Sequence, residues 1–215
     1  MLPTTPNISL GEPFIELASI DSTNIYAMNL VHQGLALSGS CIRAAYQTQG
    51  KGQHGRNWES SAGLNLLCSY VLELKQLNPV KIWTPVDQIG FSAAVALGVQ
   101  SFFEGYAGPE TKIKKPNDIY WGDRKAGGIL IENVVRGQVW TWSVVGIGIN
   151  INQELFSQEG AYPISLKQIT QQNFDLNELQ KALSSSLKTA LIDWIKIGEA
   201  ATLEKMEAQC IVLKK

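Results

Sequence analysis

The stretch KIKKPNDIYWGDRKAGGILIEN, at residues 112–133, is the most informative part of this 215-residue sequence. Three lysines lead into a Pro-Asn-Asp corner, and two short apolar runs then flank a Gly-Asp turn. Two apolar runs joined by a tight turn predict a β-hairpin. Lys125 and a pair of glycines follow the turn, so we expect one lysine beside bare backbone, facing further cations. Such a place suits an anionic ligand whose charge grows during a reaction.

Hydrophobic patterns along the rest of the chain predict an α+β fold. Runs typical of strands occur at residues 14–20, 40–46, 64–74 and 139–146. Helices are expected after the capping residues 21–23, to about residue 32, and at residues 85–104 and 175–195. Because strands outnumber helices and several are joined by tight turns, we expect a mixed, largely antiparallel sheet covered on one face by helices.

Charge and cysteine content argue against several classes of protein. The formal net charge is -1, so binding to DNA or to an anionic membrane finds no support. Cys41, Cys68 and Cys210 are widely spaced among apolar residues, which indicates free thiols in a reducing cytosol. With only 2 histidines, no fixed metal site is expected. The chain shows no signal peptide and no apolar run of the ~20 residues that span a membrane, so we expect a cytoplasmic protein.

Three further segments carry residues suited to a ligand site. Residues 21–24, Asp-Ser-Thr-Asn, either bind a polar ligand at a helix start or form an ordinary N-cap. Residues 47–58 form a glycine-rich loop with Lys51 and Arg56, which is either a mobile surface loop or a lid over phosphates. Residues 146–152, GIGININ, either leave room for a slender ligand or pack closely under a helix.

In this order, the segments resemble the catalytic core of the biotin protein ligases. The matching blocks are Ser22-Thr23-Asn24, the loop ending in Arg56-Asn57-Trp58, Lys114-Lys115-Pro116-Asn117-Asp118, Lys125-Ala126-Gly127-Gly128-Ile129-Leu130 and Gly146-Ile147-Gly148-Ile149-Asn150. Several blocks in a fixed order are far more specific than one motif. The resemblance covers residues 14–152 and implies the class II aminoacyl-tRNA-synthetase-like fold of the biotin and lipoate ligases.

The resemblance implies a reaction in two steps. Biotin and ATP, with Mg²⁺, give biotinoyl-AMP and pyrophosphate, and biotin then passes to a lysine of a biotin carboxyl carrier protein domain. It implies that Lys125 neutralises the first transition state and that Asp118 is the base or orienter for the acceptor lysine. The implied biotin-binding residues are Ser22, Thr23, Asn24, Gln47, Gly50, Lys51, Lys125, Gly128 and Gly146. The implied ATP-binding residues are Lys51, Gln53, Arg56, Trp58, Lys114, Asn117 and Asn150, with the two asparagines reading adenine.

The sequence departs from the family at four positions. Lys51, Gln53 and His54 stand where the family carries arginines, so we expect a weaker grip on phosphate and a less firmly retained adenylate. Lys115 stands in place of the family's tryptophan, and the sequence offers no role for it.

The resemblance also implies how the chain is divided. Residues 1–200 are expected to form the catalytic domain, and residues 201–215 a remnant of a C-terminal domain or a terminal strand near residues 210–213. The segment before residue 14 is too short for the DNA-binding domain of bifunctional members, so a short form that does not bind DNA is expected. An exposed edge strand is able to pair two subunits as a homodimer.

Two other functions compete with biotin ligation. A lipoate or octanoate ligase or transferase shares the fold and a key lysine, but this chain lacks the Arg-Arg-x-Ser-Gly-Gly-Gly loop usual in those relatives. A non-catalytic nucleotide-binding or carrier-docking protein is the alternative of another class, and the presence of Lys125 argues against it.

Overall fold

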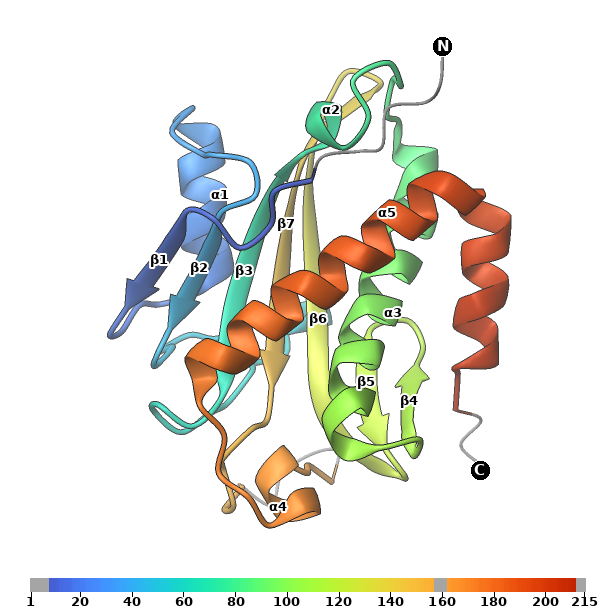
Figure 1. Ribbon diagram of the computed structural model, residues 1–215. Helices are drawn as coiled ribbons and strands as arrows, with labels where there is room; N and C mark the ends of the chain where they lie inside the picture. Colours follow the sequence, from blue (N-terminus) through green and yellow to red (C-terminus); the bar gives the residue numbers. More distant parts are fainter. Residues whose placement is uncertain (1–7, 157–161, 212–215) are drawn as a thin grey trace.

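A single sheet forms the frame of the molecule (Figure 1). The computed structural model describes residues 8–156 and 162–211, which form one 7-stranded sheet in the order β1-β2-β3-β7-β6-β5-β4. The strands are β1 (Phe14–Leu17), β2 (Cys41–Ala44), β3 (Leu66–Glu73), β4 (Thr111–Lys114), β5 (Asp118–Trp121), β6 (Arg124–Arg136) and β7 (Val139–Ile149). Only β1 and β2 pair in parallel among these strands, which confirms the expected mixed, largely antiparallel sheet.

Besides two short 3₁₀ helices at Gln53–Gly55 and Pro85–Asp87, the described fold contains two long α-helices and three shorter ones. They are α1 (Thr23–His32), α2 (Leu74–Leu77), α3 (Gln88–Ala107), α4 (Leu166–Thr170) and α5 (Leu176–Ala208). The helix expected to end near residue 195 is longer because the chain resumes helical structure after a break at Gly198, where φ is 82°. Glycine adopts this left-handed conformation without steric cost. In Figure 1 the part of α5 after the break runs back beside β4.

The residues after α5 cover part of an edge strand. The Ile113 N–H donates to the Gln209 carbonyl and the Ile211 N–H donates to the Ile113 carbonyl, each at 2.9 Å. Cys210 thereby forms an isolated parallel bridge with Ile113 of β4. The remainder of the expected terminal strand, residues 212–213, lies outside the described residues, and the assignment of residues 201–215 to a separate domain stays a prediction.

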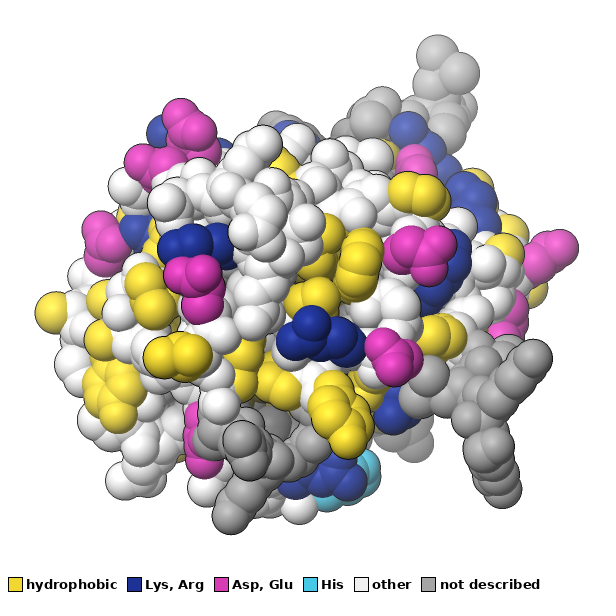
Figure 2. Space-filling view, turned by 90° about the horizontal axis from the view of Figure 1, so that it is seen from below, with side chains coloured by type: hydrophobic (Ala, Val, Ile, Leu, Met, Phe, Trp, Pro, Cys, Tyr) yellow, Lys and Arg dark blue, Asp and Glu magenta, His cyan; other side chains and the backbone are white. Residues whose placement is uncertain are grey.

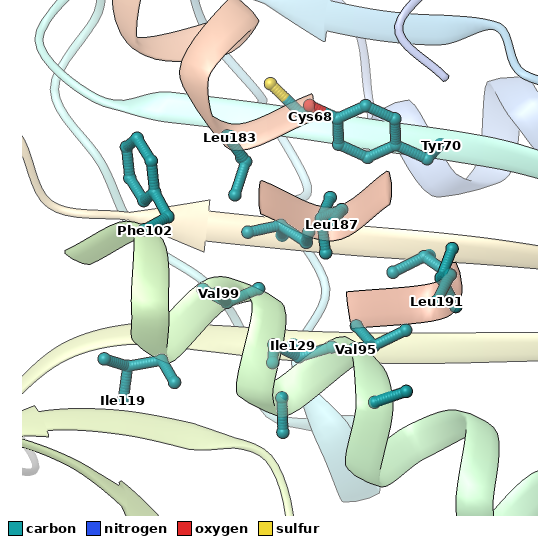
Figure 3. Close-up of a cluster of buried hydrophobic side chains, with 14 of the residues drawn as sticks. Cys68, Tyr70, Val95, Val99, Phe102, Ile119, Ile129, Leu183, Leu187 and Leu191 are labelled. Atoms are coloured by element: carbon teal, nitrogen blue, oxygen red, sulfur yellow. The ribbon is translucent and has the colours of Figure 1, made fainter. Parts of the chain in front are cut away.

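The main core lies between the sheet and the two long helices (Figure 3). Side chains of α3 and α5 interdigitate over strand residues; among those labelled in Figure 3 are Val95, Val99, Phe102, Leu183, Leu187, Leu191, Ile119 and Ile129. The two helices approach closely at Gly98, where a Cβ atom would lie 3.1 Å from the Leu187 Cα. This packing explains the small residues of the predicted helix at 85–104.

A second, smaller cluster lies on the opposite face of the sheet. Ala27 and Val31 of α1 pack there against Ile42, Val71 and Val144, all of them buried. The expectation that helices cover one face was therefore incomplete, because α1 covers part of the other face. The rest of that face remains available for a site.

Helix α3 is a core helix. Residues Pro85–Ala107 are long and apolar enough, by length and composition alone, to cross a membrane, yet 61% of the most apolar window is buried inside the molecule. A helix that is apolar on all sides is typical of the interior of a protein. On the end of the molecule seen in Figure 2, Lys and Arg side chains are interspersed with Asp and Glu, in keeping with the small net charge.

All three cysteines are free thiols, as expected. Cys41 and Cys68 are buried on the neighbouring strands β2 and β3, and Cys210 is half-buried.

Candidate active site

A cavity of about 390 Å³ brings the four sequence segments together. It lies on the sheet face that carries α1, beside the start of that helix. The predicted residues that line it are Ser22, Thr23, Asn24, Gln47, Lys51, Gln53, Arg56, Trp58, Lys114, Asn117, Asp118, Lys125, Gly128 and Gly146. Its volume is in the range of small-molecule pockets. Of the predicted residues, Gly50 and Asn150 are not among its lining residues.

A row of residues in register across four strands forms the floor of the cavity. Gly148 of β7 pairs with Gly128 of β6. Gly128 pairs in turn with Asp118 of β5, and Asp118 pairs with Lys114 of β4. At a strand spacing of about 4.8 Å, this row is about 14 Å long. The two glycines, which leave the backbone uncovered by side chains of their own, therefore lie in one row with the carboxylate of Asp118 and the ammonium group of Lys114.

A β-bulge aims Lys125 into the cavity. Asp118 lies opposite Gly128, and two residues further along β5, Tyr120 lies opposite Lys125 instead of Ala126. Ala126 is therefore an extra residue in β6, and its side chain is completely buried in the main core. If β6 continued regularly through Ala126, the alternation of side chains would place Ala126 on the cavity face and Lys125 on the opposite face.

Positive charge gathers at the Lys125 end of the cavity. The Lys125 ammonium forms an ion pair with Asp118, with Nζ 2.6 Å from Oδ1, and the side chains are only 24% and 20% exposed. The Lys114 ammonium donates to the Tyr120 hydroxyl at 3.2 Å. A partly buried lysine of this kind exchanges its carboxylate partner for a phosphate or carboxylate of a ligand at little desolvation cost.

Lys115, which the sequence left without a role, lines the cavity and reaches toward α5. Its ammonium pairs with Glu207 in the last turn of that helix, and the two side chains are 46% and 58% exposed. An exposed pair of this kind stabilises a protein only slightly. It nevertheless connects the corner beside the cavity to the end of α5.

The Trp58 indole covers the glycine floor. A Cβ atom on Gly148 would lie 2.5 Å from Trp58 Cε2, and one on Gly128 would lie 3.0 Å from Cζ3. The Lys125 ammonium lies 5.7 Å from the centre of the indole. Within the described residues, the buried Trp58 Nε1 has no hydrogen-bond partner. The bare face that was expected to admit a ligand is thus in contact with an aromatic side chain.

The other end of the cavity is polar and uncharged. The Thr23 backbone N–H donates to Gln47 Oε1 at 2.8 Å, and the Asn24 amide lies directly over Gly146, where a Cβ atom would overlap it. Ser22 is the N-cap residue of α1, but its hydroxyl makes no capping hydrogen bond. It is 1% exposed and lines the cavity. An ordinary N-cap function therefore does not account for the side chain of Ser22.

The glycine-rich loop folds over the cavity as a small hairpin. Lys51 and Asn57 form an antiparallel bridge, and the Gly52 N–H donates to the Arg56 carbonyl at 2.7 Å. Gly50, although not a lining residue, accepts from the Trp58 N–H at 2.8 Å and has no room for a side chain. Gly50 therefore closes the hairpin that carries Trp58.

Asn150 lies beside the bulge. Its side chain is buried, and the Nδ2 group donates to the carbonyls of Ile164, at 3.1 Å, and Lys125, at 3.4 Å. The Asn150 backbone N–H donates to the carbonyl of the bulged Ala126 at 2.9 Å. Asn152, the second asparagine of the segment, bonds to the backbone of Phe174.

Sequence reasoning missed two polar residues that support the neutral end. Ser69 of β3 is completely buried and bonds to Thr23 and Asn24, and Glu132 of β6 bonds to Asn24. The signal was present in the alternation of β6, because Gly128, Leu130 and Glu132 share one face of that strand. The partner strands that make this face part of the site are not visible in the sequence.

Comparison with known proteins identifies the family. The model of the biotin/lipoate A/B protein ligase family matches residues 16–150, which is more than half of the chain. The chain belongs to the biotin/lipoate A/B protein ligase family. Every residue that lines the cavity lies between Ser22 and Gly148, inside the segment that this family shares. The resemblance predicted from the motifs is confirmed.

Curated members of the family extend beyond the matched segment. The bifunctional ligase/repressor BirA of Escherichia coli is 32% identical over 195 residues, which are 89% of this chain and 57% of that protein. A biotin–[acetyl-CoA-carboxylase] ligase of Mycobacterium tuberculosis is 29% identical over 182 residues, covering 83% of this chain and 64% of that protein. The chain thus spans less than two thirds of the length of these relatives.

Solved structures of the family share the fold. The biotin protein ligase from Aquifex aeolicus in complex with biotin and ATP superimposes with a TM-score of 0.75 at 24% identity, covering 93% of this chain and 79% of that one. This likeness confirms the predicted fold class.

Proposed function

We propose that this chain is a biotin–[biotin carboxyl-carrier protein] ligase, which activates biotin with ATP and transfers it to a lysine of a carrier domain. The observation that carries the proposal is the position of Lys125. The bulge places Lys125 beside the bare backbone of Gly128, at the cationic end of a cavity whose other end offers neutral hydrogen-bonding groups. The names of the Escherichia coli and Mycobacterium tuberculosis relatives support a ligase, and the latter supports biotin as the acid.

The first step brings two anions together, the carboxylate of biotin and the α-phosphate of ATP. A carboxylate oxygen attacks the α-phosphorus, the bond from that phosphorus to the bridging oxygen breaks, and pyrophosphate leaves. The Lys125 ammonium reduces the repulsion between the anions and stabilises the charge of the transition state. Mg²⁺ enters with the phosphates as part of the substrate. Asp118, 2.6 Å from Lys125, holds the ammonium in place before the ligands bind.

The second step forms an amide. The acceptor lysine must lose a proton before its nitrogen attacks the carbonyl carbon of the mixed anhydride, and AMP then leaves with the bonding electrons. Asp118 is our candidate for the group that accepts or orients this proton. It is the carboxylate of the cavity floor, one strand from Gly128.

The two ends of the cavity suit the two substrates. For the biotin ring we propose the neutral end with Ser22, Thr23 and Gln47, and for the phosphates the cationic residues Lys51, Arg56 and Lys114. Asn117 lines the cavity and is our candidate for contacting adenine. Asn150 reaches adenine only if its bonds to the Lys125 and Ile164 carbonyls break.

We propose that residues 1–200 make up the catalytic domain, because the cavity and both long helices that support it lie largely within them. We place the reaction in the cytoplasm, and the three free cysteines support a reducing compartment. The partner is the carrier domain of a biotin-dependent carboxylase.

Biotin-dependent exchange of pyrophosphate into ATP, followed by biotin transfer to a purified carrier domain, tests the proposal. We expect Lys125→Ala to lower the exchange rate about 10²–10³-fold, since it removes the charge that stabilises the transition state. The melting temperature should stay close to that of the wild type. Lys196→Ala, an exposed lysine on α5, is the matched control and should keep full activity.

Three results would contradict the proposal. Exchange that depends on lipoate or octanoate instead of biotin would assign the chain to the other branch of the family. ATP binding without labelling of a carrier would indicate a non-catalytic protein. Wild-type exchange rates in Lys125→Ala would remove the assigned function of that lysine.

A further inference from the structure

A chain of hydrogen bonds leads from Glu132 on β6 to Gln47 at the neutral end of the cavity. The Asn24 amide Nδ2 donates to Glu132 Oε2 at 2.8 Å and to the Leu130 carbonyl at 3.3 Å. Asn24 Oδ1 accepts from Ser69 Oγ at 2.6 Å. Asn24 is 3% exposed and Ser69 is 0% exposed, so water does not substitute freely for these partners.

Glu132 fixes the direction of the first two bonds. A carboxylate only accepts hydrogen bonds, and so does the Leu130 carbonyl, which means that the Asn24 amide must turn its Nδ2 group toward them. Asn24 Oδ1 then faces Ser69 and can only accept. Because a serine hydroxyl carries one hydrogen, the hydrogen of Ser69 is committed to Asn24.

The hydrogen of the Thr23 hydroxyl is committed to the protein as a consequence. Thr23 Oγ1 lies 2.8 Å from Ser69 Oγ and 3.0 Å from Gln47 Oε1. Ser69 has no second hydrogen to give, and Gln47 Oε1 already accepts from the Thr23 backbone N–H at 2.8 Å. Both neighbours of the Thr23 hydroxyl are therefore acceptors, and its hydrogen goes to one of them.

The neutral end then presents a fixed pattern to a ligand. Thr23 Oγ1 offers only a lone pair, so it accepts a hydrogen bond from the ligand. Gln47 offers the hydrogens of its Nε2 group, for which the described residues provide no hydrogen-bond acceptor. One acceptor beside one donor is complementary to an N–H group next to a carbonyl, which is the edge of a cyclic urea or amide.

We propose that Glu132 is a positioning residue that sets the hydrogen-bond direction of this end and so makes the cavity selective for a ureido edge. Glu132 acts through Asn24, Ser69 and Thr23 and need not touch the ligand. The proposal rests on the proposed function, since the ureido ring is the head group of biotin.

The test compares Glu132→Gln with Glu132→Asp in the exchange assay. Glutamine keeps the shape of the side chain but both donates and accepts, so only the longer bond to the Leu130 carbonyl, at 3.3 Å, still orients the Asn24 amide, and its preference for one direction is weakened. We expect the KM for biotin to rise about tenfold, or about 1.4 kcal/mol, with kcat and the KM for ATP nearly unchanged. The preference for biotin over its cyclic carbamate analogue, which carries a ring oxygen in place of the N–H that faces Thr23, should narrow, because Thr23 Oγ1 is then able to donate.

Glu132→Asp separates the effect of hydrogen-bond direction from the effect of side-chain length. Aspartate is shorter but still only accepts, so this variant should keep the preference for biotin over the carbamate analogue even where its KM for biotin rises. Glu204→Gln, an exposed carboxylate on α5, controls for the loss of charge and should change neither quantity.

The outcomes are distinguishable. An unchanged KM for biotin and an unchanged preference in Glu132→Gln would overturn the proposal while leaving the ligase function intact. A lower kcat together with a rise in both KM values and a lower melting temperature would also overturn it, because these changes indicate general damage to the fold. A wild-type protein without biotin-dependent exchange would remove the proposed function and this inference together.

Discussion

Two glycines on the floor of the site leave space for other side chains of the protein. Gly146 leaves room for the Asn24 amide, and Gly148 leaves room for the Trp58 indole. Glycine in a strand costs conformational entropy, and close approach of another group is one of the few reasons to keep it there. These glycines therefore shape the cavity by letting side chains of α1 and of the loop lie against the sheet.

Gly148→Ala tests this interpretation. The new methyl group would lie 2.5 Å from Trp58 Cε2, so the indole must leave the floor. Because Trp58 is carried by a surface loop, the fold should persist with little change in the free energy of unfolding. We expect the KM for biotin or ATP to rise about tenfold in the exchange assay, a loss of about 1.4 kcal/mol.

Gly105→Ala is the matched control for that substitution. Gly105 lies in α3, and a Cβ atom added there would meet no group within 4 Å outside the backbone of its own helix. Alanine should therefore raise the free energy of unfolding by about 0.5–1 kcal/mol. Its KM values should stay at wild-type levels. Equal KM values in both variants would show that Trp58 does not shape the cavity.

At the scale of elements, local irregularities decide where functional groups point. The bulge at Ala126 in β6 brings Lys125 to the cavity face, and the buried Asn150 amide donates to the Lys125 carbonyl beside the bulge. The break at Gly198 returns the end of α5 to β4, the strand that ends in Lys114. Regular continuation of either element would move these groups away from each other.

The start of α5 offers a prediction about stability. The Asp175 carboxylate accepts from the Asn177 N–H at 2.6 Å and from the Glu178 N–H at 3.2 Å, so Asp175 caps the helix. Asp175→Ala should lower the free energy of unfolding by about 1 kcal/mol. Thermal denaturation should show a melting temperature about 2–4 °C lower. An equal loss in Lys196→Ala, an exposed position of the same helix, would show that the loss does not come from the cap.

At the scale of the whole molecule, the two faces of the sheet have different tasks. α3 and α5 cover one face with the main core, whereas α1 covers only part of the other and leaves the remainder for the cavity. The strands between them carry core residues on one side and site residues on the other. The site is thus built on strands that are anchored in the main core.

The main core also contains Tyr70, a titratable group whose burial should make the protein less stable at high pH. Burial, followed by the proximity of Cys41 and Cys68, raises the pKa of Tyr70 well above its usual range, and its hydroxyl lies 2.9 Å from Ser184 Oγ. A tyrosine of ordinary pKa, about 10, releases its proton in the unfolded chain while the folded protein retains it. Above pH ~10 the unfolded state therefore binds fewer protons, and the free energy of unfolding falls as pH rises.

Tyr70→Phe should flatten this dependence. At pH 7 the variant loses about 1 kcal/mol with the hydrogen bond to Ser184, but its stability should fall less steeply than that of the wild type above pH ~10. Urea denaturation from pH 7 to 11 measures both effects. Tyr162→Phe, at a position that is 79% exposed, should follow the wild-type curve. Parallel curves for the wild type and Tyr70→Phe would contradict the prediction.

The elements with strong periodicity were predictable from the sequence. The apolar faces of the two long helices and the strands at residues 14–17, 41–44, 66–73 and 139–149 lie within or close to the predicted ranges. Strand β4 was not predicted, because its lysines alternate with buried Thr111 and Ile113 over only four residues. The position of α1 on the second face was also missed, since an apolar stripe does not indicate which face of a sheet it will cover.

The sequence by itself determined the family, the type of sheet and the four segments that supply nearly all of the residues that line the cavity. Each of these follows from motifs or patterns within one segment of the chain. Only the tertiary structure decided that the Ala126 bulge turns Lys125 to the cavity, that Asn150 points into the protein, and that Glu132 supports Asn24 across the sheet. These features depend on register and on pairing between residues far apart in the chain, which local patterns do not encode.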